Sequence, residues 1–70
     1  MMTVEQFRTQ VEVFLAESGM APTRFGRDAV GDPNFVFQIR AGRAPGLRLA
    51  ERALAFIAAR RASLLEERAA

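Results

Sequence analysis

Apolar side chains recur every three or four residues through the first segment of the chain, which places them on one face of an α-helix. These positions are Val4, Phe7, Val11, Phe14 and Leu15. Thr3 stands before the first of them and Gln6 follows three residues after Thr3, the spacing of a capping box at a helix start. Gly19 stands where helices commonly end in a left-handed residue. The pattern therefore predicts a helix over residues 3–18.

Two segments that each begin with a proline follow. Pro22 and Pro33 stand where the first turn of a helix tolerates proline, because an N–H at that position has no partner within the helix. A glycine and then Asp32, a candidate cap, separate the two segments. We expect short helices over residues 23–29 and 33–41, the second ended by a glycine. A strand over the second segment is the alternative, since proline can head a strand and glycine can end one.

The last segment contains no glycine or proline from residue 47 onward. It is rich in Ala, Leu, Glu and Arg, which are good helix formers. The residues expected to close the core from this helix are Leu47, Ala50, Leu54 and Ile57. The whole pattern predicts an all-α fold: a compact four-helix domain over residues 1–61, whose long C-terminal helix continues as an extension over residues 62–70.

The helix expected over residues 33–41 has an apolar and a polar face, since successive side chains are about 100° apart. Phe35, Val36 and Ile39 share the apolar face, whereas Asn34, Phe37, Gln38 and Ala41 lie outside it. In the preceding segment Gly26 sits mid-helix, where glycine costs about 1 kcal/mol relative to alanine. A close crossing of the two helices explains this glycine, and alanine is expected to be tolerated there. Two such helices joined by the short turn at residues 30–32 form a helix-turn-helix.

At these residues the chain resembles the lambda-repressor-like, or Xre-type, helix-turn-helix family. The matching features are the pair Phe25-Gly26, the buried positions Val36 and Ile39, and the exit Gly42-Arg43-Ala44-Pro45. The resemblance covers about residues 4–57. The family usually has glycine at the position of Val30, one residue earlier than Gly31 in this chain. The resemblance implies a sequence-specific double-stranded DNA-binding protein, a small transcriptional regulator that reads the major groove with helix 33–41.

The resemblance also implies a set of contact residues. Asn34, Phe37 and Gln38 would face base edges, while Thr23, Arg24, Arg27, Arg40 and Arg43 would bind phosphates. The chemistry agrees, because Asn and Gln can pair with adenine in the major groove and an aromatic edge can contact a thymine methyl group. Each arginine could instead be an ordinary solvated charge, and Phe37 could be an extra core or dimer residue.

Charge and composition narrow the range of functions. The formal net charge of the 70 residues is only +2, but residues 20–48 hold five arginines against two aspartates. The chain lacks His, Cys, Lys and Tyr, so the usual general bases, thiol nucleophile and Schiff-base amine are missing. We therefore expect no enzyme activity, no cofactor and no metal. The absence of cysteine and of a long apolar run predicts a cytoplasmic protein without a membrane segment, and the DNA binding that the resemblance implies makes it nucleoid-associated.

The C-terminal helix suggests partners. If the other apolar residues of this helix are buried in the core, Phe56, Leu64 and Leu65 remain as an exposed patch. Such a patch predicts a homodimer. Fraying of residues 62–70 is the alternative. The rival function is a small helical protein-interaction module, antitoxin-like or an adaptor for RNA polymerase, that uses Phe37 and the C-terminal helix.

Overall fold

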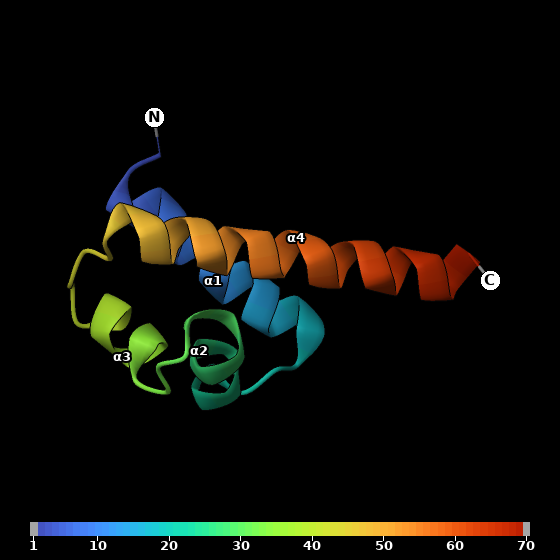
Figure 1. The fold of residues 1–70 in the computed structure, drawn as a ribbon, viewed down its shortest axis with the longest axis horizontal. Helices are drawn as coiled ribbons and strands as arrows, with labels where there is room; N and C mark the ends of the chain where they lie inside the picture. The colour runs from blue at the N-terminus through green and yellow to red at the C-terminus, as the bar shows by residue number, and fades with distance from the viewer. Residues whose placement is uncertain (1, 70) are drawn as a thin grey trace.

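The computed structural model describes residues 2–69, which form four helices and no strand (Figure 1). The helices are α1 (Val4–Ser18), α2 (Pro22–Val30), α3 (Phe35–Arg40) and α4 (Leu47–Ala69). The all-α prediction is confirmed, and the alternative of a strand over residues 33–41 is wrong. In Figure 1, α4 runs across the upper part of the view with α1 passing behind it, and α2 and α3 lie below them. Within residues 2–69 no helix is both long enough and apolar enough to cross a membrane.

The capping of α1 is as the sequence predicts. The Thr3 hydroxyl accepts a hydrogen bond from the Gln6 backbone N–H at 3.0 Å, and the Gln6 side chain accepts one from the Thr3 N–H at 2.9 Å. Gly19 ends the helix in the left-handed conformation, with φ 70°, and its N–H donates to the Leu15 carbonyl. Local chemistry alone therefore fixes both ends of this helix.

The two middle helices differ in length from the prediction. Helix α2 begins one residue earlier, at Pro22, and extends to Val30. Helix α3 has six residues and begins at Phe35, so the expected start at Pro33 is wrong. The reason is Asp32, whose carboxylate accepts from the Asn34 N–H at 2.9 Å and whose carbonyl accepts from the Phe35 N–H at 3.1 Å. These bonds hold residues 32–34 as a turn before the helix begins.

The core is built from all four helices. Its fully buried members are Phe7, Val11, Phe14, Leu15, Phe25, Ala29, Val30, Phe35, Val36, Ile39, Ala53 and Ile57. Helix α4 contributes Ala53 and Ile57, while Leu47, expected in the core, is 77% exposed. Six residues at about 100° each put Leu47 roughly 120° around the helix from Ala53. Phe56, expected outside the core, packs edge-on against Phe25 with ring centroids 5.5 Å apart.

The turn between α2 and α3 presses against Gly26. The Gly26 carbonyl accepts from the Asp32 N–H at 3.1 Å. A Cβ atom at Gly26 would overlap the carbonyl oxygen of Asp32 and lie 3.2 Å from the Cβ of Phe35. The close crossing predicted at this glycine is confirmed, but it is tighter than expected, because the nearest neighbour is rigid backbone. The expectation that alanine fits at this position is wrong.

Gly26→Ala should therefore destabilise the domain by about 1–3 kcal/mol, the usual range for overpacking a core, even though alanine favours a helix. Urea unfolding followed by circular dichroism measures the change. Gly46→Ala is the matched control, because a Cβ there meets no atom within 4 Å. A Gly26→Ala protein as stable as the control would contradict this description of the turn.

Candidate nucleic-acid interface

The outer face of α3 presents an amide and an aromatic ring at its N-terminal end. Phe35, Val36 and Ile39 point into the core, and the ring of Phe35 packs edge-on against Phe7 at 6.3 Å. This orientation leaves Asn34 exposed and the ring of Phe37 46% exposed. Asn34 stands at the cap position of α3, yet its side chain makes no capping hydrogen bond. Its amide is therefore free to contact a ligand.

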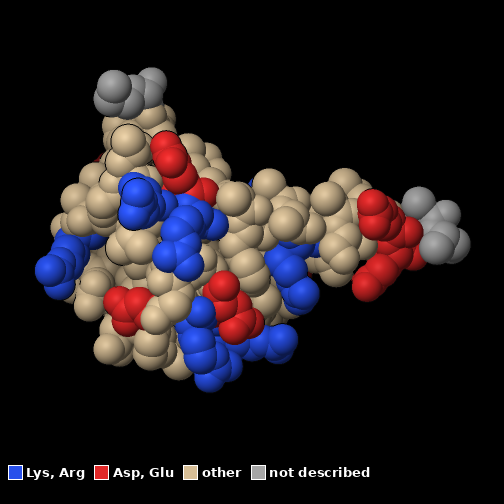
Figure 2. Space-filling view, viewed as in Figure 1, with Lys and Arg blue, Asp and Glu red and all other residues tan. Residues whose placement is uncertain are grey.

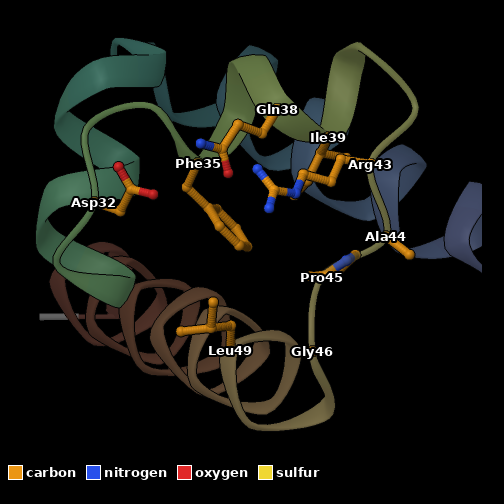
Figure 3. Close-up of a pocket in the computed structure, with 9 residues that line it drawn as sticks. All are labelled: Asp32, Phe35, Gln38, Ile39, Arg43, Ala44, Pro45, Gly46 and Leu49. Carbon is orange, nitrogen blue, oxygen red and sulfur yellow. The ribbon is translucent and has the colours of Figure 1, made fainter.

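Gln38, one helical turn after Asn34, lies at the edge of a cleft between α3 and the start of α4 (Figure 3). The cleft has a volume of about 400 Å³, and its lining is Asp32, Phe35, Gln38, Ile39, Arg43, Ala44, Pro45, Gly46 and Leu49. In Figure 3 the Gln38 amide and the Arg43 guanidinium point toward each other above the Phe35 ring. The backbone N–H of Arg43 also donates to the backbone carbonyl of Gln38 at 3.0 Å. The structure thus brings the Gln38 side chain together with Arg43 in the cleft.

Arg40 is held by a partner on another helix. Its guanidinium forms two hydrogen bonds with the Glu12 carboxylate of α1, both 2.8 Å long, and lies 5.9 Å from the centre of the Phe37 ring. The hydrogen bond from Arg40 lowers the pKa of the Glu12 carboxyl, against the opposing effect of partial burial. The same pairing raises the pKa of Arg40. Arg40 cannot offer this pair of N–H groups to a phosphate without releasing Glu12, so its direct phosphate contact stays a prediction.

The arginines of α2 are more open. Arg24 and Arg27 share a single carboxylate, Asp28, with N···O distances of 3.4 Å and 3.8 Å, and their side chains are 60% and 65% exposed. Thr23 is exposed at the start of the same helix, where no side chain caps the backbone N–H groups. Figure 2 shows arginine side chains gathered at the lower edge of the molecule, where α2 lies in Figure 1, with carboxylates close by. One carboxylate cannot neutralise two arginines, so a positive charge remains here.

The three residues predicted for a dimer interface fall in different surroundings. Phe56 packs against Phe14 and Phe25 in the chain's own core. Leu64 and Leu65, at 39% and 65% exposed, lie where α4 projects beyond the other helices (Figure 1). Every residue from 62 to 68 is exposed. The patch predicted from sequence therefore reduces to the two leucines.

Sequence reasoning missed two features of this surface. The Glu12–Arg40 pair joins residues 28 positions apart, and no local pattern signals such a contact. A second apolar groove lies between the start of α1 and the start of α4, where Met2, Val4 and Leu47 are exposed. No sequence signal pointed to this groove, because the helical spacing placed Leu47 among the core positions.

Comparison with known protein families, characterised proteins and solved structures finds no match to this chain. Over residues 2–69 no group of three or more acidic, histidine or cysteine side chains is placed to hold a metal ion. The function must therefore be inferred from the surface of the molecule itself.

The Glu12–Arg40 pair predicts a pH-dependent stability. Because the pKa of Glu12 is lower in the folded protein, the pair stabilises the fold above the ordinary glutamate pKa, and this stabilisation is lost as pH falls through the lowered value. Glu12→Gln should be less stable than the wild type at pH 7, and the difference should shrink between about pH 5 and pH 3.

Urea denaturation at a series of pH values measures this difference. Arg40→Gln and the double variant complete a double-mutant cycle, in which the two single losses should not add. Additive losses, or a difference that persists unchanged at pH 3, would show that the pair contributes nothing to stability.

Proposed function

We propose that the protein binds double-stranded DNA sequence-specifically, as a small regulator of transcription at the nucleoid. The observation that carries the proposal is the arrangement of α2 and α3. The turn at Asp32 joins the two helices and leaves Asn34 exposed with a free side chain, while arginines that share one carboxylate extend from α2. A short helix with open polar groups beside a second, basic helix is the arrangement with which helix-turn-helix proteins enter the major groove.

In this proposal the N-terminal end of α3 reads bases. The Asn34 amide can donate to adenine N7 and accept from adenine N6, and the exposed edge of Phe37 can contact a thymine methyl group. Gln38 contributes from the same helix if its side chain turns out of the cleft. Arg40, held by Glu12, keeps the far end of α3 against α1 and so fixes the angle of the helix.

In this proposal α2 binds the DNA backbone. Thr23 and the uncapped N–H groups at the helix start suit a phosphate oxygen, because the partial positive charge of a helix N-terminus favours anions. The exposed side chains of Arg24 and Arg27 add positive charge. Arg43 supplies a further cation from the loop after α3. Backbone contacts of this kind position a protein, whereas base contacts specify its site.

Asn34→Ala should weaken binding to the best site by about 1–3 kcal/mol and change binding to random DNA little, because only base contacts distinguish sequences. The site is first found by selection from random DNA, and fluorescence anisotropy then measures both affinities. Gln10→Ala, which removes an exposed amide from α1, is the control. Equal losses on both DNAs would mean that Asn34 does not read bases.

Arg24→Ala and Arg27→Ala should weaken binding to every sequence alike. Each should lower the slope of log affinity against log salt by about one unit, since each phosphate contact releases counterions. Arg52→Ala on α4 is the charge-matched control, because Arg52 is exposed and lies about 100–140° around the helix from the buried Ala53 and Ile57. A slope that stays at the wild-type value in both variants would remove these arginines from the DNA contact.

A second candidate function is a protein-interaction module, antitoxin-like or an adaptor for RNA polymerase. The observation that favours it is Phe37, a large apolar ring 46% exposed on a chain of net charge only +2. The salt titration separates the two functions. Binding to DNA weakens steeply as salt rises, whereas an apolar contact through Phe37 does not.

A further inference from the structure

The C-terminal part of α4 is sparsely packed, with Glu17 of α1 near Leu64 and Leu65. Residues 62–68 are all exposed, and Figure 1 shows this part of α4 projecting past α1, α2 and α3. Leu65 is 65% exposed at its tip, and Leu64 lies beside Glu17 and Arg61 of the same chain. A solvated leucine on an isolated helix is unfavourable unless another surface covers it.

The opposite end of the molecule holds an open apolar groove between α1 and α4. Its volume is about 350 Å³, and its lining is Met2, Thr3, Val4, Phe7, Pro45, Leu47, Ala50, Glu51 and Leu54. Met2 and Val4 are each 42% exposed, and Leu47 is 77% exposed, so three large apolar side chains surround this groove in contact with water. Together they form a patch of the kind that marks contact sites on monomers.

The tip and the groove lie on the same face of α4. Leu47 and Leu65 are 18 positions apart, about five full turns at 3.6 residues per turn, which corresponds to about 27 Å along the helix. Leu54 and Ala58 fall between them on the same stripe, the first half-buried and the second exposed. This face therefore runs from the groove to the projecting tip.

We propose that two copies of this chain associate antiparallel along α4, with Leu65 of each copy seated in the Met2–Val4–Leu47 groove of the other. In the antiparallel arrangement each tip lies on the groove of the other copy. It also sets the larger Leu54 of one copy opposite the smaller Ala58 of the other. The contact is self-complementary, as a closed two-fold dimer requires. A parallel pair would bring the two tips together beyond the body and leave both grooves in water.

Charge on the flank of this stripe fits the antiparallel direction. Arg48 follows Leu47 and Glu66 follows Leu65, so the two charges lie on the same flank of α4, and both are exposed. Antiparallel packing brings the Arg48 of each copy beside the Glu66 of the other, and the two-fold makes this ion pair twice. Figure 2 shows the acidic side chains near the end of the projecting helix, far from the start of α4. Phe56 takes no part in this contact, because it packs in the core of its own chain.

Sedimentation equilibrium without DNA tests the association independently of the DNA-binding proposal. Leu65→Glu should abolish the dimer. Arg48→Glu and Glu66→Arg should each raise the dimer dissociation constant about tenfold, because each change breaks two ion pairs and makes like-charge contacts. The double variant should restore the wild-type constant, and Arg60→Glu, an equal charge change on another face of α4, should leave it unchanged. A monomeric wild type at about 100 μM, far above a typical specific Kd, or a double variant no tighter than the singles, would overturn the proposal.

Cysteine cross-linking tests the direction of the pair, because the chain has no cysteine of its own. Leu47→Cys mixed with Leu65→Cys should form a disulfide between the two variants under mild oxidation, and each variant alone should form little. Within one chain the two positions are about 27 Å apart, too far for a disulfide. Cross-linking of Leu65→Cys to itself in preference to the mixture would overturn the antiparallel arrangement.

Discussion

The contact between Gly26 and the backbone of Asp32 is the constraint on which the rest of the surface depends. This contact requires a residue without a side chain in the middle of α2. The backbone of the turn then packs directly against that helix. Asp32 then bonds to the N–H groups of the next residues and delays the start of α3 until Phe35. Because the helix starts there, Phe35 reaches the core and Asn34 points to water.

Helix α3 is too short to hold its own orientation, and the structure fixes it at both ends. Its six residues fall well below the length at which an isolated helix is stable in water. The Asp32 turn holds its start, and the bidentate Glu12–Arg40 pair ties its end to α1. The cleft toward α4 leaves that side of α3 open (Figure 3). An arginine used in this way stabilises the orientation of the surface that α3 presents.

The sequence predicted the features that depend on near neighbours. The capping box at Thr3, the glycine after α1, and the buried Phe35, Val36 and Ile39 all follow from short-range chemistry and helical spacing. It did not predict Leu47 at the surface or Phe56 in the core, because those outcomes depend on how α4 is rotated against the other helices. The Glu12–Arg40 pair lay beyond any local pattern because it joins α1 to α3, across 28 positions of sequence. Among the predicted contact residues, Asn34 and Phe37 share the open face, while Gln38 and Arg43 meet at the cleft.

Helix α4 has one face in the core and another in water, and the small size of the domain makes this difference important for stability. A chain of about 60–70 residues buries only about 60% of its unfolded surface and has little stability to spare. The first part of α4 offsets this by placing Ala53 and Ile57 in the core and Phe56 against the core aromatics. None of residues 62–68, in the last part of α4, is buried, although the exposed leucines there cost free energy in water. In the proposed dimer a second copy would cover the face of α4 that joins this tip to the open groove, and so add burial that the small core of one chain does not provide.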